Sequence, residues 1–165
     1  MKNKNSVIIC GFPGIGKSWI KFNSILSCLQ GSVFSITDSD SSKWGKDRFP
    51  DNYINYISGN HKANPVNLLM LSTHKEVIKG LVEKGLNPTI VYPDRSLKDE
   101  YLDRYRNRSN KAAFVEILNS KWDDFIDDIE SFSCPKIKLN TDEYLVDVLV
   151  FDDKKGVSLL KDRVI

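Results

Sequence analysis

Residues 11–18 have the spacing of a loop that binds phosphate groups. They read Gly-Phe-Pro-Gly-Ile-Gly-Lys-Ser, a G-x-x-x-x-G-K-S pattern. Glycines let backbone N–H groups approach phosphate oxygens, and the N-terminus of a following helix adds partial positive charge. Lys17 would then reach the β- and γ-phosphates of a nucleotide, and the Ser18 hydroxyl would be a ligand of Mg²⁺. The residues expected to hold the nucleotide are Gly11, Pro13, Gly14, Ile15, Gly16, Lys17, Ser18 and Trp19.

The sequence on both sides of this loop favours the same interpretation. An apolar run at 7–10 precedes it, and residues 18–30 read as a helix that Gly31 ends. The alternative is a chance glycine-rich turn between a core strand and a helix. At average residue usage the four fixed positions occur by accident in roughly one chain of this size in a hundred. The pattern and its flanks together therefore predict a phosphate-binding loop.

Two carboxylates follow the second predicted strand. Asp38 or Asp40 could accept a proton from an acceptor hydroxyl or hold a water on Mg²⁺, while the alternative for Asp38 is a turn residue that ends the strand. The third strand lacks the terminal aspartate of a Walker B element and has Ser72 in its place. Metal binding is therefore expected of Ser18, Asp38 and the nucleotide itself. His74, at the same sheet edge, either contacts the substrate or begins a helix.

Three arginines lie in the segment 93–110, which we expect to be a lid. Arg95 precedes a predicted helix, and Arg104 and Arg108 lie at i and i+4 on its half-apolar face. Guanidinium groups there suit a cover that closes over phosphates as the transition state gains negative charge. The alternative is ordinary helix stabilisation, in which Glu100 pairs with Arg104.

The segment 43–49 mixes basic and aromatic side chains. In an acceptor site Trp44 or Phe49 could stack on a base while Lys43 or Arg48 meets a phosphate. The alternative is a surface loop anchored by one tryptophan. The substrate-binding residues expected from this segment and from the strand ends are Asp38, Asp40, Trp44, Arg48 and His74.

Strands alternate with helices along the chain. The patterns predict strands at 6–10, 32–37, 67–71, 89–92 and 136–139. They predict helices at 18–30, 51–58, 75–84 and 96–106, a long amphipathic helix at about 114–129, and a last helix at 141–150. The long helix carries acidic side chains at 123, 124, 127 and 128, expected to be a solvated face, and the tail from 152 fits no single element.

This order predicts an α/β fold in a single domain over residues 1–165. Its sheet should be parallel, with right-handed crossovers and helices on both faces. Because ligands of such sheets bind at the carboxyl ends of the strands, the segments after Cys10, Thr37, Leu71 and Tyr92 are expected to converge on one site.

Composition limits the other classes of protein. The net charge of +2 gives no strongly basic field that would demand nucleic acid as a partner. Three cysteines without C-x-x-C spacing favour a reducing compartment and no structural metal. No apolar run reaches the ~20 residues that cross a bilayer, and residues 1–5 contain no signal-peptide core. We therefore expect a cytoplasmic protein, or one made in a host's cytoplasm, with no membrane partner.

Four segments, 11–18, 38–40, 72–77 and 92–105, together resemble small P-loop kinases of the nucleoside/nucleotide kinase superfamily. The chain is similar to compact phage-type members: deoxynucleoside monophosphate kinases, adenylate kinase-like proteins and DNA-base kinases. The resemblance implies a three-layer P-loop NTPase fold with strand order 2-3-1-4-5, ATP as donor with Mg²⁺, and an arginine-bearing lid. The catalytic residues it implies are Lys17, Asp38, Arg95, Arg104 and Arg108.

In this resemblance Asp38 corresponds to the acceptor-side aspartate of kinases that phosphorylate hydroxyls. The chain departs from nucleoside monophosphate kinases after the third strand, where residues 72–74 read Ser-Thr-His instead of the Asp-Gly-x-Pro-Arg segment. This departure disfavours a monophosphate as the acceptor.

Three functions follow from these patterns. The leading prediction is an ATP-dependent phosphotransferase that moves the γ-phosphate to a nucleotide or nucleoside. The second is a kinase acting on a hydroxyl of DNA or RNA, at a 5′ end or a hydroxymethylated base, which Asp38 favours and the lack of a basic stripe disfavours. The third is a nucleotide-binding regulatory module without significant transfer, which the missing Walker B carboxylate favours and the lid arginines disfavour.

Overall fold

The computed structural model describes residues 6–29, 34–39, 41–63 and 65–165. It is an α/β fold around a five-stranded parallel sheet. In spatial order the strands are β2 (Ile36–Asp38), β3 (Leu68–Leu71), β1 (Val7–Gly11), β4 (Thr89–Pro93) and β5 (Lys136–Leu139). The predicted α/β class, the parallel sheet and the strand order 2-3-1-4-5 are confirmed.

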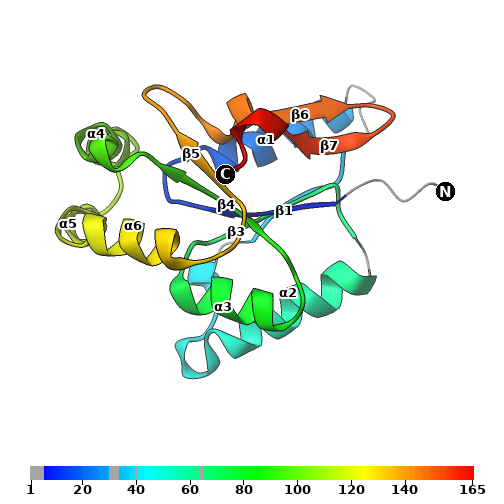
Figure 1. The fold of residues 1–165 in the computed structure, drawn as a ribbon, viewed down its shortest axis with the longest axis horizontal. Coiled ribbons are helices and arrows are strands. Elements are labelled where there is room, and N and C mark those ends of the chain that lie inside the picture. The colour runs from blue at the N-terminus through cyan, green and yellow to red at the C-terminus, as the bar shows by residue number, and fades with distance from the viewer. Residues whose placement is uncertain (1–5, 30–33, 40, 64) are drawn as a thin grey trace.

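Helices cover both faces of this sheet. They are α1 (Lys17–Leu29), α2 (Asp51–Ala63), α3 (Lys75–Glu83), α4 (Lys98–Asn107), α5 (Ala112–Ser120) and α6 (Trp122–Ser131). Figure 1 shows α2, α3 and α6 on one face, and α1 with a β-hairpin on the other. A strand covered on both faces is apolar throughout rather than alternating, and all four residues of β3 are buried.

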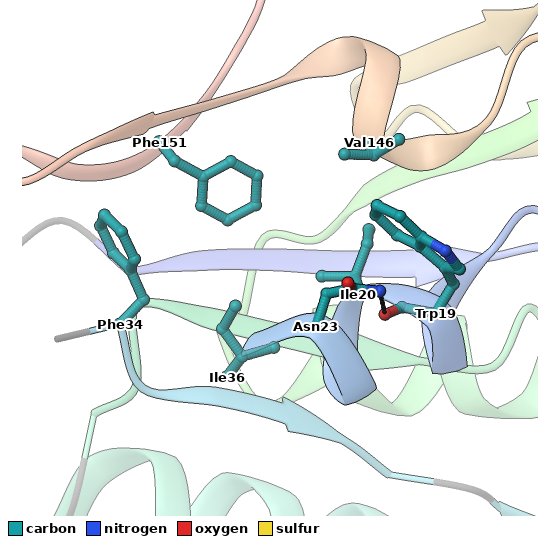
Figure 2. Close-up of a pocket in the computed structure, with 7 residues that line it drawn as sticks. All are labelled: Trp19, Ile20, Asn23, Phe34, Ile36, Val146 and Phe151. Atoms are coloured by element: carbon teal, nitrogen blue, oxygen red, sulfur yellow. Dashed lines mark hydrogen bonds between the residues drawn. The ribbon is translucent and has the colours of Figure 1, made fainter. Parts of the chain in front are cut away.

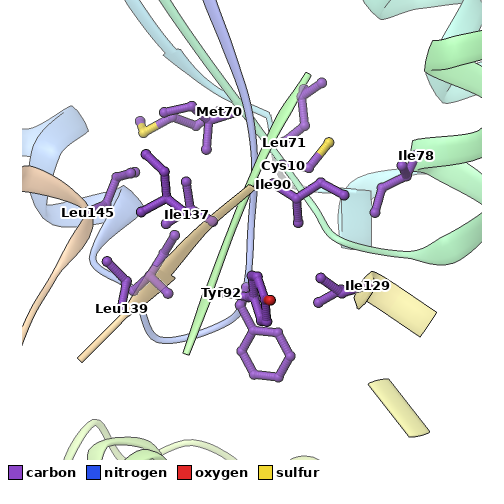
Figure 3. Close-up of a cluster of buried hydrophobic side chains, with 14 of the residues drawn as sticks. Cys10, Met70, Leu71, Ile78, Ile90, Tyr92, Ile129, Ile137, Leu139 and Leu145 are labelled. Carbon is purple, nitrogen blue, oxygen red and sulfur yellow. The ribbon is translucent and has the colours of Figure 1, made fainter. Parts of the chain in front are cut away.

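The core lies where the central strands meet side chains from both layers. Figure 3 shows Cys10, Met70 and Ile90 on the strands, with Ile78 of α3 and Ile129 of α6 on one side of them. Each of these five side chains is at most 2% exposed. Burial at this level holds the carboxyl ends of the strands, and the loops that follow them, in fixed relative positions.

The predicted long helix at 114–129 is wrong, because the chain forms two helices that meet at Lys121. The break lets the Trp122 side chain turn inward. Its ring packs edge-on against Phe12 at a centroid distance of 5.4 Å, and its Nε1 donates to the Arg95 carbonyl at 2.9 Å. Helical periodicity alone does not record such a change of direction, since both halves keep apolar side chains at helical spacing.

The predicted helix at 141–150 is also wrong. The chain forms a 3₁₀ turn (Leu145–Val148) and then the hairpin of β6 (Leu149–Asp152) and β7 (Gly156–Leu159). Within the two strands Val150, Phe151 and Val157 are of residue types that favour extended backbone, and Gly156 adopts the left-handed φ of 91° that the hairpin turn requires. The tail from residue 152, which fitted no single predicted element, therefore contains β7 and a 3₁₀ turn (Lys161–Arg163).

Other boundaries shift more modestly. The predicted end of α2 before Gly59 is wrong: the helix continues to Ala63, because burial of Tyr53, Ile54 and Ile57 outweighs the low helix propensity of one glycine. The first strand is Val7–Gly11 instead of 6–10. The predicted end of α1 at 30–31 and the predicted start of the second strand at 32–33 lie outside the described residues.

Among the described residues, the helices are all too short or too polar to cross a membrane.

Candidate functional site

The glycine-rich loop, residues 11–16, joins the central strand β1 to α1. Gly14 and Gly16 have φ of 86° and 96°, in the left-handed region that glycine adopts without strain. A Cβ on Gly14 would lie 2.8 Å from Cε1 of the buried Tyr105, and a Cβ on Gly16 would lie 3.3 Å from Cδ1 of Tyr144. The sequence pattern therefore has a local physical cause: the backbone favours glycine at 14 and 16, and at 14 the buried Tyr105 ring also leaves no space for a Cβ.

Three successive carbonyl groups of the loop accept hydrogen bonds from α4 and from Leu145, which lie on one side of the loop. The Tyr105 hydroxyl donates to the Pro13 carbonyl at 2.8 Å, and Arg104 Nη1 donates to the Gly14 carbonyl at 3.4 Å. The Leu145 backbone N–H donates to the Ile15 carbonyl at 2.8 Å. Burial raises the pKa of Tyr105, so its hydroxyl remains a donor at neutral pH.

The direction of these carbonyls fixes the direction of the next N–H groups. In a trans peptide the carbonyl and the following N–H point opposite ways. The N–H groups of Gly14, Ile15 and Gly16 therefore point away from α4 and from Leu145, which ends a turn at residues 140–145. Successive N–H groups that point to one side form a concave anion site, and the N-terminus of α1 adds partial positive charge beside it.

Lys17 and Ser18 begin α1 at the rim of the loop. The Lys17 ammonium donates to the carbonyls of Gly11 and Phe12, at 2.6 and 3.1 Å, so the charge lies across the loop. The Ser18 hydroxyl donates to Asp38 Oδ2 at 3.4 Å. The structure thus brings together three side chains that the sequence assigned to one site, from the carboxyl ends of β1 and β2.

The other acceptor-side residues are distributed over three places. His74 is the exposed N-cap residue of α3, and its ring packs edge-on against Phe49 with the centroids 5.9 Å apart. Trp44 is half-buried and packs against Tyr53 and Tyr56, with centroid distances of 5.6 and 4.9 Å. Arg48 is exposed in a short 3₁₀ turn. Asp40 lies outside the described residues. Trp44 therefore has an anchoring role whether or not a base stacks on this cluster.

The three predicted lid arginines do not converge. The Arg104 guanidinium lies between the rings of Tyr101 and Tyr144, 4.5 and 4.0 Å from their centroids, and its side chain is 10% exposed. It binds Glu100 at 2.5 Å in addition to the Gly14 carbonyl. Arg108 is exposed at the C-terminal end of α4.

Arg95 is bound by α6 instead. It donates to Asp123 at 3.0 Å, to Asp127, and to Glu130 at 3.5 Å. Asp128 of the same helix pairs with Lys75. Asp123, Asp124 and Asp127 are exposed, so the expected solvated face of α6 is confirmed, but three of its four aspartates also pair with cations of neighbouring elements.

An open apolar pocket of about 130 Å³ lies beside the loop on the α1 face (Figure 2). Its lining comes from α1, from β2 and the residues just before it, from the turn before β6 and from the hairpin: Trp19, Ile20, Asn23, Phe34, Ile36, Val146 and Phe151. Trp19, predicted to contact the nucleotide, is 57% exposed at its edge. The pocket lies between the first turn of α1 and Val146, which belongs to the segment 141–150 that was predicted to be a helix.

Several residues of the site were not predicted. Tyr105 lies in a segment that carried the resemblance but received no role, and Glu143 and Tyr144 lay in the segment predicted as helix. A tyrosine at each of 101 and 105, one helical turn apart next to arginines, was the available signal for a buried face toward the loop.

Comparison with models of protein families and with curated proteins gives no match. The functional argument therefore rests on the geometry of the loop and its neighbours.

Proposed function

We propose that this protein binds ATP at the glycine-rich loop and transfers its γ-phosphate to a nucleotide or nucleoside. The observation that carries the proposal is the orientation of the loop peptides. Donors behind the loop hold the carbonyls of Pro13, Gly14 and Ile15, so three successive N–H groups point to the other side. Such a row of N–H groups, with the α1 N-terminus and Lys17 beside it, matches the several oxygens of the β- and γ-phosphates.

The architecture that goes with this proposal is a three-layer P-loop NTPase fold with the segment 93–110 as an arginine-bearing lid. The position of the loop after the central strand of the 2-3-1-4-5 sheet supports it. For Arg104 to serve the phosphates, its guanidinium must exchange Glu100 for phosphate oxygens while it keeps the hydrogen bond to the Gly14 carbonyl that orients the loop. Arg95 must similarly leave the carboxylates of α6.

Mg²⁺ is the metal that accompanies this chemistry, and the residues present fit it. Ser18 Oγ and Asp38 Oδ2 lie 3.4 Å apart. The Ser72 hydroxyl oxygen is buried without a hydrogen-bond partner at the end of β3, the strand between β1 and β2, and could bind a water of the ion. Among the described residues, no three His, Cys, Asp or Glu side chains form a metal-binding group, so phosphates and waters would supply the other ligands, as Mg²⁺ favours. Bound there, the ion neutralises charge on the phosphate oxygens.

Asp38 is the proposed base for an acceptor hydroxyl. The hydroxyl proton passes to the Asp38 carboxylate as the acceptor oxygen bonds to the γ-phosphorus. The bond from phosphorus to the β–γ bridging oxygen breaks, which leaves ADP. Lys17 carries positive charge for the β- and γ-phosphates after leaving the carbonyls of Gly11 and Phe12. The same chemistry serves a hydroxyl of DNA or RNA.

A second candidate function is a nucleotide-binding regulatory module without transfer. The observation that favours it is that Arg95 and Arg104 are each held by carboxylates, as a protein that binds nucleotide without stabilising a transition state would retain them. Transfer of the γ-phosphate from ATP to an acceptor distinguishes the two candidates.

The test is transfer of label from γ-³²P-ATP with Mg²⁺ to a panel of acceptors: deoxynucleoside and ribonucleoside monophosphates, nucleosides, 5′-hydroxyl DNA and hydroxymethylated DNA. We expect one class to be labelled by the wild type and by Lys62→Ala, an exposed control lysine on α2. We expect labelling to fall at least about a hundredfold in Lys17→Ala. ATP binding without a labelled product supports the regulatory module, and no binding refutes both functions.

A further inference from the structure

Residues 161–165 contact β5, the edge strand of the sheet that pairs with β4. Ile165 and Lys136 exchange two backbone hydrogen bonds, at 2.9 and 2.8 Å. Two residues earlier, the Arg163 guanidinium forms a two-pronged pair with the Glu143 carboxylate, at 2.7 and 2.8 Å. Both side chains are about three-quarters buried, and Arg163 also donates to the Lys138 carbonyl at 3.0 Å. A paired geometry of this kind fixes the orientation of both groups.

Glu143 in turn shapes the residues around it, the 140–145 turn. Its Oε2 accepts the backbone N–H of Asn140 at 2.8 Å. Asp142 has a left-handed φ of 59°, and its N–H donates to the Glu100 carboxylate at 3.2 Å. A turn with a strained residue keeps its shape only where its surroundings hold it. Here Arg163 holds it on one side and Glu100 on the other.

Two residues of the 140–145 turn contact the glycine-rich loop directly, and a third, Glu143, is linked to it through Arg104. Arg104 Nη2 donates to the Glu143 carbonyl at 3.2 Å while its Nη1 donates to the Gly14 carbonyl. The Leu145 N–H donates to the Ile15 carbonyl, and the Tyr144 ring fills the space beside Gly16. Two of the three carbonyl groups that orient the loop N–H groups therefore depend on this turn.

We propose that Arg163 and Glu143 are positioning residues for the phosphate site. Through the 140–145 turn and Arg104, their pair holds the Gly14 and Ile15 carbonyls back and so keeps the following N–H groups aimed at the nucleotide. The inference rests on the proposed function for its ligand, but the loop geometry that it concerns belongs to the free protein. Loss of the pair frees the turn, and the two loop peptides can then rotate and lose their common direction.

The test uses Arg163→Ala, with Arg163→Lys as the variant that keeps the charge without the two-pronged geometry. Arg106→Ala is the matched control, since Arg106 is exposed and pairs with Asp103 of its own helix, α4. Hydrogen exchange of the free proteins is followed at the Leu145 amide, which binds the Ile15 carbonyl, and at the Met70 amide of the central sheet. Binding of Mg·ATP is measured by calorimetry on the same proteins.

In Arg163→Ala we expect exchange at Leu145 and the Kd for Mg·ATP each to rise roughly tenfold, with exchange at Met70 unchanged. Arg163→Lys should give intermediate values, and Arg106→Ala should match the wild type. Combined with Arg104→Ala, Arg163→Ala should add little further loss of affinity, because both act on the same loop peptides. Glu143→Gln replaces Arg163→Ala if that variant does not fold.

Unchanged exchange at Leu145 would overturn the inference. A rise of equal size at Met70 would overturn it as well, because the pair would then contribute only to global stability. Failure of the wild type to bind Mg·ATP refutes the proposed function, while the exchange rates still decide whether the pair holds the loop.

Discussion

Substitution of Gly14 by alanine measures how strictly the loop conformation is imposed. At φ of 86° an L-residue costs about 1–2 kcal/mol relative to glycine. The new Cβ would also lie 2.8 Å from Cε1 of Tyr105. That ring cannot move aside cheaply, because it is 1% exposed and its hydroxyl is bound to the Pro13 carbonyl. Overpacking of a buried site costs about 1–3 kcal/mol, so Gly14→Ala should lower the free energy of unfolding by about 2–5 kcal/mol.

Two other glycines separate these contributions. Gly85 also has a positive φ, 73°, but no atom lies within 4 Å of its Cβ position, so Gly85→Ala should lose only the backbone part, about 1–2 kcal/mol. Gly59 lies within α2 with open space around its Cβ position. Gly59→Ala should therefore raise the free energy of unfolding by about 0.5–1 kcal/mol.

The assay is equilibrium unfolding in urea, followed by circular dichroism, with slopes compared among the four proteins. The reasoning predicts the order Gly59→Ala, wild type, Gly85→Ala, Gly14→Ala from most to least stable. If Gly14→Ala were as stable as Gly85→Ala, the contact between the loop and Tyr105 would be refuted. If it were as stable as the wild type, the left-handed backbone at 14 would be refuted too.

Three further predictions concern single side chains. Asp38→Asn should lower turnover about 10²–10⁴-fold with little change in ATP affinity if Asp38 is the base, measured by steady-state kinetics. Arg95→Ala should change stability little, because its ion pairs with α6 are solvent-exposed, but it should lower kcat more than it raises KM if Arg95 is a lid arginine. The Arg163 guanidinium lowers the pKa of Glu143 to about 2 from its usual 4.5. The pair therefore stabilises the fold fully above a pH of about 4.5, and this contribution is lost as the pH falls toward 2. Urea unfolding at several pH values measures the loss.

Each of these has a contrary outcome. Normal kinetics in Asp38→Asn would leave Asp38 as a turn residue, and weaker Mg·ATP binding would indicate support of the metal. Normal kinetics in Arg95→Ala would mean that it only ties the start of α4 to α6. A stability difference between the wild type and Glu143→Gln that stays constant from pH 6 to pH 3 would contradict the Glu143 assignment.

The sheet was predictable from sequence because apolar strands that are buried on both faces stand out as runs, as in β3 and β4. The meeting of Ser18 with Asp38 was predictable for a related reason: carboxyl ends of parallel strands share one edge. Both inferences depend on local pattern and on topology, which one sequence contains.

The supports behind the loop were not predictable in the same way. The contact of Leu145 with Ile15 joins residues far apart in the chain, and the extended hairpin after it depends on pairing that helical periodicity does not register. The partners of Arg95 are likewise distant in the chain, and they face Arg95 because the chain changes direction at Lys121, between α5 and α6. The sequence places Arg104 and Arg108 on one face of a predicted helix, but the partners of Arg95 and Arg104 depend on tertiary packing.

The central claim is that the glycine-rich loop is a nucleotide-binding site, and calorimetric titration of Mg·ATP tests it most directly. The wild type should bind one equivalent saturably. Lys17→Ala should fold normally, because this side chain is not part of the hydrophobic core, yet it should bind at least about a hundredfold more weakly, because it loses the ammonium that lies across the loop. Equal affinity in the two proteins, or no binding to the folded wild type, would contradict the claim.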